Sequence, residues 1–413
     1  MRIVFLTKYF PPDAIGGGEI SADYLGRALI RRGHKITVIK RGEKNQDSEQ
    51  NGLRVLARRK LFNKEVPNFE FAWAKKQAKI LLPDIPKDTE IIHAHDFHSA
   101  LIAAELKKIL PVKIRFVATV RDYWPVCGYG KVKSSGEICP GCKTWKDFRD
   151  CPKVSRGNIL QKYARMFRYY HNIPKRQKAL AVFDHVVYIS RALQTEIYKS
   201  VNMAVKIETE TVIGNPIPDD AEKNTASGQN NGKTILFAGL LDLHKGLDIL
   251  LKALRQVAKK ADFNLIVAGS GPLFSDYKKI AENLKLQEKV NFLGRVPYRL
   301  MPDLYNKADI VIAPGLWPEP FGRSLLEGMA YGKAVIATGH GAPLEFIQNN
   351  KTGILVAPNN VLELAERIIF ILQNPEARKK MGDRAREYVL ENFAPAKIAA
   401  EYEKVYQFPS LRA

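Results

Sequence analysis

Short apolar runs alternate with amphipathic stretches along most of the chain. In the N-terminal half, an apolar run at 3–7 leads into three glycines, and apolar residues then recur at helical spacing up to Arg32. Further strands are predicted at 36–39, 91–93, 116–120 and 186–189. Strands that alternate with helices are typical of parallel sheets covered by helices.

The same alternation restarts at 234–239. Helices are predicted at 246–258 and 375–406, and strands at 265–268, 290–292, 310–313 and 334–338. The segment 214–218, followed by polar residues 219–233, is expected to connect two halves. We therefore predict an α/β protein with two doubly wound, Rossmann-like domains, 1–212 and 213–390, and a final segment 391–413 that crosses back as a helix. Ligands of such sheets bind beyond the carboxyl ends of the strands.

Composition supports a globular chain and adds a charge asymmetry. Hydrophobic residues make up 46% and charged residues 26% of the 413 positions, and no apolar run reaches the ~18 residues of a membrane helix. The N-terminal run has a strand pattern without a cleavage site, so we expect a cytoplasmic protein. Residues 1–210 hold 39 Lys and Arg against 21 Asp and Glu, which is +18 of the total +22. An anionic partner is therefore expected on the first half.

The segment 319–327 contains the most specific chemistry. Glu319 stands just before a predicted helix that Gly322 opens, and Glu327 stands in the second turn of that helix. A helix N-terminus suits an anion, and a carboxylate is a common acceptor for the hydroxyls of a ribose or a sugar. Without other motifs, the simpler interpretation is that Glu327 is a surface residue of the helix and that Glu319 interacts with the helix dipole in the first turn.

The glutamate segment does not stand alone. Together with the segments 239–246, 267–272, 292–294 and 341–345, it resembles the family 4 retaining glycosyltransferases, which have the GT-B fold. The glycine-rich loop at 16–18 and the passage 32–38 extend the resemblance to the N-terminal half. The resemblance implies that the two domains face a cleft, that the donor is a nucleoside-diphosphate sugar and that no catalytic metal is needed.

The resemblance also implies residue roles. Glu327 matches the position that hydrogen-bonds the nucleotide ribose, Glu319 the one that contacts the donor sugar, and Lys245 the one that neutralises the diphosphate. Glu319 and Lys245 are therefore catalytic candidates. The other donor-binding positions supply backbone contacts or room for the donor: Gly17, Gly18, Gly239, Phe321, Gly322, Arg323 and Ser324.

Two positions depart from the family pattern. The family usually has an arginine after the glycine that is Gly239 here, and this chain has Leu240, so the clamp on the diphosphate is incomplete unless Arg323 or another basic residue substitutes. The family commonly has a histidine where this chain has Arg121. A guanidinium stays protonated and cannot act as a base, so Arg121 is expected to hold an anionic group of donor or acceptor, and it completes the catalytic set.

The acceptor is expected to be a lipid-linked or cell-envelope glycan bound by the first domain. Asp13, Glu19 and Asp122 are its candidate contacts. His95 and His98 follow the predicted strand 91–93, where they either line the cleft or are ordinary loop histidines.

All four cysteines fall in the insert 127–151: Cys127, Cys139, Cys142 and Cys151. Their spacing is compatible with a structural Zn²⁺ site. Two disulfides, unligated thiols and an iron–sulfur cluster are the alternatives. A catalytic Zn²⁺ is disfavoured because four cysteines would close the coordination sphere.

Residues 153–178 contain eight Lys and Arg, interleaved with aromatic residues, and no Asp or Glu. This composition fits attachment to an anionic membrane interface. Nucleic acid and a plain solvated helix face are the alternatives, and we favour the inner face of the membrane because a lipid-linked acceptor lies there.

Two other functions compete with a glycosyltransferase. A dinucleotide-dependent oxidoreductase is disfavoured because Gly-x-Gly-x-x-Gly does not follow the first strand. A non-catalytic GT-B-fold protein that binds an anionic partner stays the alternative, since Leu240 and Arg121 stand where the family usually has arginine and histidine.

Overall fold

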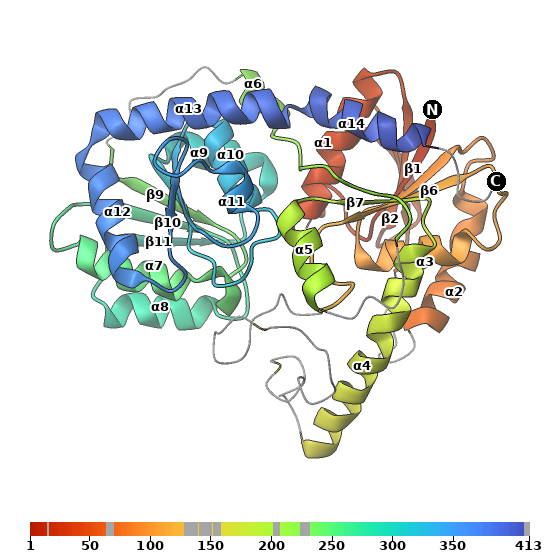
Figure 1. Ribbon diagram of the computed structural model, residues 1–413, viewed down its shortest axis with the longest axis horizontal. Coiled ribbons are helices and arrows are strands. Elements are labelled where there is room, and N and C mark those ends of the chain that lie inside the picture. The colour runs from red at the N-terminus through yellow and green to blue at the C-terminus, as the bar shows by residue number, and fades with distance from the viewer. Residues whose placement is uncertain are drawn as a thin grey trace. The chain divides into compact units, whose positions relative to one another are not determined.

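The computed structural model describes residues 1–14, 16–62, 70–127, 139, 151, 158–200, 207–223 and 232–408. Their contacts divide into two compact units. The first unit contains 1–127, 151, 158–216 and 395–408 of the described residues, and the second contains 139 and 217–394. Each unit is built on one sheet (Figure 1).

The first unit has an eight-stranded sheet with helices on both faces. Its elements are β1 (Arg2–Leu6), α1 (Gly17–Arg31), β2 (Lys35–Arg41), β3 (Gln46–Gln50), β4 (Leu53–Arg58), α2 (Glu70–Leu81), η1 (Leu82–Asp84), β5 (Ile91–Ala94), α3 (Phe97–Leu106), β6 (Arg115–Val120), α4 (Ile159–Ala181), β7 (His185–Tyr188), α5 (Arg191–Ser200), β8 (Glu210–Val212) and α14 (Pro395–Gln407). The strand order is β3-β4-β2-β1-β5-β6-β7-β8. The central strands are almost wholly apolar because parallel strands are buried on both faces.

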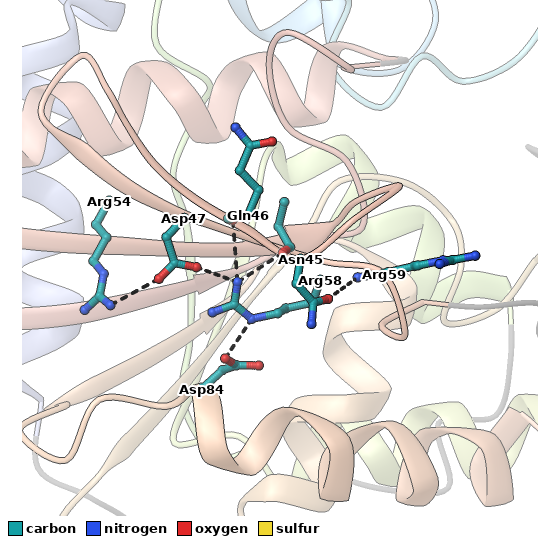
Figure 2. A network of polar contacts seen from close by, with 8 residues as sticks. Asn45, Gln46, Asp47, Arg54, Arg58, Arg59 and Asp84 are labelled. Carbon is teal, nitrogen blue, oxygen red and sulfur yellow. Dashed lines mark hydrogen bonds and ion pairs between the residues drawn. The ribbon is translucent and has the colours of Figure 1, made fainter.

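The polar strand β3 closes one edge of this sheet and is antiparallel to β4. Arg58, at the end of β4, holds the edge: its Nη1 lies 2.6 Å from Oδ1 of Asp47, and its Nε lies 2.7 Å from Oδ1 of Asp84 (Figure 2). The hydrogen bond from Arg58 lowers the pKa of Asp47. Charged residues on an edge strand discourage pairing with strands of other molecules.

The last helix, α14, completes the core of the first unit. The hydroxyl of Tyr406 lies 2.8 Å from Nδ1 of His93 on β5, and the hydroxyl of Tyr402 lies 3.1 Å from Oγ1 of Thr119 on β6. All four side chains are buried. The C-terminal helix therefore packs with residues from the start of the chain, and it also lies against α1.

The second unit has a six-stranded parallel sheet. Its elements are α6 (Asp219–Lys223), β9 (Thr234–Ala238), η3 (Leu243–Lys245), α7 (Leu247–Val257), β10 (Asn264–Ala268), α8 (Phe274–Asn283), β11 (Val290–Gly294), η4 (Tyr298–Leu300), α9 (Met301–Lys307), β12 (Ile310–Ala313), α10 (Arg323–Ala330), β13 (Ala334–Thr338), α11 (Pro343–Phe346), β14 (Ile354–Val356), α12 (Val361–Gln373) and α13 (Pro375–Phe393). The strand order is β11-β10-β9-β12-β13-β14. Helices α7, α8 and α12 share a buried apolar core with one face of the sheet.

Both sheets contain a point at which the strand order reverses. In the first unit, the chain runs outward from β1 to β2 and β4, and then returns to β5 on the other side of β1. In the second unit, it runs from β9 to β10 and β11, and then returns to β12. The loops that follow the two strands at a reversal diverge and leave room for a ligand at the carboxyl edge.

The structure has elements that the sequence did not predict. They include strands β3, β4, β8 and β14 and the short helix α6, where Asp220 accepts a hydrogen bond from the hydroxyl of Tyr331 at 2.6 Å. The predicted helix 375–406 is divided into α13 and α14 at Pro395, since a residue before proline avoids the helical conformation. Among the described residues, no helix has the length and apolar content to span a membrane.

We expect Glu403→Gln to destabilise the protein at neutral pH and to have less effect in acid. Glu403 accepts hydrogen bonds from Arg32 at 2.7 and 2.8 Å and contacts His34 at 2.7 Å. The bond from Arg32, helped by His34, lowers the pKa of Glu403 to about 2. Such a carboxylate stabilises the fold above its unfolded pKa, and this contribution is lost as the pH falls toward its folded pKa. The melting temperature should fall by about 2–4 °C at pH 7, and the difference should shrink below pH 4.5.

Asp88→Asn is the matched control, because the Arg2–Asp88 pair leaves both side chains about half exposed. Its melting temperature should change by less than about 1 °C. An equal effect of Glu403→Gln at every pH would contradict the assigned role of this carboxylate.

Candidate functional site

Two loops of the second unit meet beyond the carboxyl ends of β9 and β12. Lys245 ends η3, which follows β9, and Glu319 follows β12. Because these strands are neighbours at the reversal of strand order, the side chains meet: Nζ of Lys245 lies 2.8 Å from Oε2 of Glu319. Nε1 of Trp317 donates a hydrogen bond to the same oxygen at 2.6 Å.

Glycines allow the close backbone contacts that position Lys245 and Glu319. Gly246 has a φ of 68°, and a Cβ there would lie 2.1 Å from the carbonyl oxygen of Pro314. Gly341 has a φ of 80°, and a Cβ there would lie 2.4 Å from the backbone nitrogen of Glu319. Only glycine combines this conformation with such close approach. Two of the motif segments therefore fix the positions of Lys245 and Glu319.

The electrostatics of this cluster favour the charged form of Glu319 beside Lys245. Burial raises the pKa of Glu319, but the charge of Lys245 and the hydrogen bonds from Lys245 and Trp317 outweigh it and lower the pKa. Nζ of Lys245 lies 4.5 Å from the centre of the Trp317 ring, and the His244 ring lies 4.4 Å from that ring. Burial and the charge of Lys245 lower the pKa of His244 to about 4, so this imidazole is neutral at pH 7.

Glu327 lies in a second buried cluster, on α10. Its Oε1 accepts from the hydroxyl of Tyr298 at 2.5 Å and pairs with Nε of Arg323 at 2.6 Å. Its Oε2 accepts from the hydroxyl of Tyr305 at 2.7 Å. Burial and the nearby Glu327 raise the pKa of Tyr305 well above its usual value, so the phenol remains a donor. Both oxygens of the predicted ribose-binding carboxylate are thus occupied.

Residues 321–324 include the N-cap and the first two residues of α10. Gly322 is the N-cap with a φ of 88°, and its carbonyl oxygen accepts from the backbone nitrogen of Leu325 at 3.0 Å. The first N–H groups of a helix have no acceptor within that helix and lie at the positive end of its dipole. This end of α10 therefore suits a phosphate or another anion.

The position after Gly239 remains uncharged at the surface. Leu240 is 49% exposed, where the family resemblance leads one to expect an arginine. Arg323, which the sequence offered as a substitute, is paired with Glu327. Lys245 is therefore the basic residue that the structure places beside Glu319.

In the first unit, Arg121 lies beyond the carboxyl end of β6. Its Nη1 donates to Oδ1 of Asn215, which follows β8, and its Nη2 lies 3.2 Å from Nδ1 of His95, which follows β5. Gly17 begins α1, and a Cβ at the adjacent Gly18 would lie 3.1 Å from Cδ of Arg121. The glycine loop and the arginine, which the sequence predicted separately, are thus neighbours.

Buried histidines lie behind this guanidinium. The rings of His95 and His93 are 3.9 Å apart, and His93 in turn contacts Tyr406 of α14. Burial, the neighbouring His93 and the charge of Arg121 lower the pKa of His95 well below its usual value. His95 is therefore a neutral acceptor that orients Arg121. Nε2 of His98 lies 3.4 Å from Nζ of Lys8.

The predicted acceptor residues each have a local contact. Asp13 lies 2.6 Å from Nζ of Lys40, Glu19 accepts from the backbone nitrogen of Gly16 at 2.9 Å, and Asp122 accepts from a backbone N–H two residues further on at 2.7 Å. Burial raises the pKa of Glu19. Glu19 therefore helps to begin α1, and an acceptor role for these three residues stays a prediction.

The metal prediction rests partly on residues that the structure leaves out. Cys127, Cys139 and Cys151 are half-buried, whereas Cys142 lies outside the described residues. Within the described part of the chain, no group of three or more His, Cys, Asp or Glu is arranged to hold a metal ion. The four-cysteine site therefore stays a prediction.

Residues that the sequence did not single out complete both clusters. They are His244, Tyr298, Tyr305 and Trp317 in the second unit, and His93, Asn215, Tyr402 and Tyr406 in the first. The sequence could have identified Trp317, because it stands two residues before Glu319. It could not have identified the four tyrosines, because they contact residues that are distant in the chain.

Comparison with known proteins finds glycosyltransferase families along most of the chain. The family described as Glycosyltransferase Family 4 matches residues 15–220, and the family described as Glycosyl transferases group 1 matches residues 219–388. An uncharacterized glycosyltransferase of Methanocaldococcus jannaschii is 27% identical over 98% of each chain.

Solved structures confirm the predicted GT-B fold. Sucrose-phosphate synthase from Thermosynechococcus elongatus superposes with a TM-score of 0.74 at 20% identity, covering 98% of each chain. HepE from Anabaena, solved in complex with UDP-glucose, gives a TM-score of 0.68 at 20% identity, covering 98% of this chain and 99% of HepE.

We expect Tyr305→Phe to destabilise the second unit more than Tyr298→Phe does. Loss of the Tyr305 hydroxyl leaves a buried oxygen of Glu327 without this donor, which should cost about 1–3 kcal/mol in the free energy of unfolding. After Tyr298→Phe, the other oxygen keeps Arg323. Urea unfolding measures both changes. Tyr198→Phe, which removes a hydrogen bond between a partly exposed tyrosine and Glu210, is the control and should cost little. Equal losses for all three variants would contradict the arrangement around Glu327.

Proposed function

The chain belongs to the family 4 glycosyltransferases of the GT-B fold, which act on nucleotide sugars, and from this premise we propose a retaining, metal-independent transfer of a sugar to a glycan acceptor. The donor is a nucleoside-diphosphate sugar. The observation that carries the proposal is the contact between Lys245 and Glu319 at the strand reversal of the second unit. The buried carboxylate of Glu327, on α10 of the same unit, supports it.

The donor roles follow from the chemistry of the second unit. Lys245 exchanges its contact with Glu319 for the diphosphate, whose negative charge grows as the sugar leaves. Glu319, released from the lysine, accepts hydroxyls of the donor sugar. The start of α10, residues 321–324, supports phosphate through backbone N–H groups. Glu327 accepts the ribose hydroxyls after Tyr298 or Arg323 gives way.

The proposed reaction takes place on one face of the sugar. The bond from the anomeric carbon to the diphosphate oxygen breaks, and the acceptor oxygen forms its bond to the same carbon from the same side. The acceptor proton passes to the leaving phosphate oxygen, which acts as the base. This route needs positioning and charge stabilisation and does not require a side-chain base, which is compatible with an arginine at position 121.

Arg121 is proposed to hold an anionic group of donor or acceptor. Its guanidinium is oriented by Asn215 and His95 beside Gly18. An oriented planar fork recognises a carboxylate or phosphate better than a hydroxyl. Asp13, Glu19 and Asp122 are the proposed acceptor contacts near the start of the first unit's helix α1 and the end of β6.

We further propose a lipid-linked or cell-envelope glycan as acceptor, met by a cytoplasmic enzyme at the inner face of the membrane. The excess of basic residues in 1–210 and the basic stretch 153–178 support an anionic surface as partner. Nucleic acid is the less favoured partner.

A non-catalytic GT-B-fold protein that binds an anionic partner is the second candidate. The exposed Leu240 favours it, because the usual second basic residue of the diphosphate clamp is missing. Turnover of a nucleotide sugar separates the two candidates.

We expect UDP-, GDP- or ADP-sugars to raise the melting temperature and to be hydrolysed slowly without acceptor. UDP-glucose is the first to test, since HepE binds it. Lys245→Ala, Glu319→Gln and Glu327→Gln should each lower hydrolysis by about a hundredfold or more. Lys252→Ala is the control, because Lys252 is a half-exposed lysine of the same unit paired with Asp248. If no nucleotide sugar stabilises the protein and none is hydrolysed, the transferase proposal fails.

We expect Arg121→Ala to lower sugar transfer by about tenfold to a hundredfold while the affinity for the nucleoside diphosphate stays the same. Arg121→Lys restores charge without the planar fork and should recover transfer only in part. Arg54→Ala changes an exposed arginine of the same unit and serves as control. Wild-type transfer by Arg121→Ala, or an equal loss of nucleoside-diphosphate binding, would refute this role.

A further inference from the structure

Trp317 occupies one oxygen of the Glu319 carboxylate. Its Nε1 donates a hydrogen bond to Oε2 of Glu319 at 2.6 Å, and Nζ of Lys245 donates to the same oxygen at 2.8 Å. Hydrogen bonds to an ionised carboxylate are shorter and stronger than those between neutral groups. The two donors share Oε2, and Oε1 takes part in neither bond.

The indole ring of Trp317 also contacts Lys245 and His244. Nζ of Lys245 is 4.5 Å from the centre of the ring, and the His244 ring is 4.4 Å from it at an interplanar angle of 55°. A Cβ at Gly315 would lie 3.4 Å from Cδ1 of Trp317, so the glycine leaves room for the indole. The backbone nitrogen of Leu316 donates to the carbonyl oxygen of His244 at 2.9 Å and joins the two loops. These contacts fix the direction of the indole N–H.

The indole N–H is redundant for Glu319 as long as the pair with Lys245 is intact. The side chain of Glu319 is only 18% exposed, and its burial acts to raise its pKa. A carboxylate in such a place is costly to leave without donors. A phenylalanine ring would be enough to fill the space beside the lysine. An N–H directed at the carboxylate therefore indicates a state in which Lys245 has another partner.

We propose that Trp317 is a positioning residue for Glu319 in the donor complex: it holds Oε2 while Lys245 moves to the diphosphate, so that Oε1 meets the hydroxyls of the donor sugar. The diphosphate attracts the charged lysine, whereas the uncharged indole N–H stays with the carboxylate. A carboxylate held through one oxygen has the other available to accept from a sugar. The inference rests on the proposed function, since it requires a nucleotide sugar as donor.

The test compares the affinities of the full chain for UDP-glucose and for UDP, measured by calorimetry. Trp317→Phe keeps an aromatic ring and removes the N–H. In the UDP complex, water fills the place of the sugar and can donate to Oε2, so the affinity for UDP should change by less than about threefold. In the UDP-glucose complex, the sugar excludes this water, so the affinity for UDP-glucose should fall by about tenfold or more. GDP-mannose with GDP, or ADP-glucose with ADP, replaces this pair if UDP-glucose does not bind.

Trp317→His is the rescue variant, because Nε2 of a histidine occupies the same ring position as Nε1 of a tryptophan. It restores an N–H donor on a smaller ring and should bind UDP-glucose more tightly than Trp317→Phe does. Trp124→Phe is the matched control. Nε1 of Trp124 is buried and has no acceptor within the described part of the chain, so the same substitution there should leave both affinities unchanged.

Tryptophan fluorescence gives a second readout of the exchange. When UDP binds, the ammonium group of Lys245 should leave the face of the Trp317 ring and so change the emission of this residue. Wild type and Trp124→Phe should show the change, and Trp317→Phe should lose most of it. A change of emission that Trp317→Phe keeps in full would contradict the exchange.

Three results would overturn the inference in variants whose melting temperature stays within about 3 °C of wild type. They are wild-type affinity for UDP-glucose in Trp317→Phe, equal losses for UDP and UDP-glucose in that variant, and no recovery in Trp317→His. Equal losses would mean that the indole only supports the loops. If wild type binds none of the nucleotide sugars, the transferase proposal fails as well. If wild type binds its donor and Trp317→Phe binds it equally, only the positioning role fails.

Discussion

The pairing of β9 with β12 is the constraint on which the donor cluster depends. It brings Lys245 and Glu319 together although 74 positions separate them in the chain. A shift of either strand by one residue would reverse the direction of its side chains and move the loop that carries the charge. Gly246 and Gly341 then remove the Cβ atoms that would hold the loops apart. The chemistry of the second unit therefore follows from the register of a parallel sheet.

The charged groups at the candidate sites already have partners within the protein. Lys245 pairs with Glu319, and Glu327 pairs with Arg323 and accepts hydrogen bonds from two tyrosines. Arg121 contacts the neutral side chains of Asn215 and His95. A ligand must exchange these contacts for its own, so its net gain is a difference between two sets of hydrogen bonds. A molecule that lacks a required hydroxyl leaves buried protein groups unpaired and is rejected strongly. Such exchange favours selectivity over tight binding.

The sequence predicted the central strands of both sheets and the helix that Gly322 opens because these depend on local periodicity and on glycine. It did not predict β3, β4, β8 and β14. The family resemblance singled out Glu319, Glu327 and Lys245, and the structure brings Lys245 and Glu319 into contact. The sequence did not predict the tyrosines around Glu327, or Asn215 and His93 near Arg121, since such contacts depend on tertiary packing. Polar composition misled at Arg176, whose guanidinium forms a buried ion pair with Glu70, because a charged side chain with a buried partner has the same composition as a solvated one.

The position of α14 has a consequence for synthesis on the ribosome. Helix α14 supplies Tyr402 and Tyr406 to the core of the first unit, but it follows the second unit in the sequence. The second unit is complete at residue 394, before this helix has been made. During synthesis, the core of the first unit therefore lacks Tyr402 and Tyr406 until the second unit and then α14 have been made. Ribosome-bound chains expose this incomplete core to chaperones, and a truncation of only the last helix removes part of the N-terminal core.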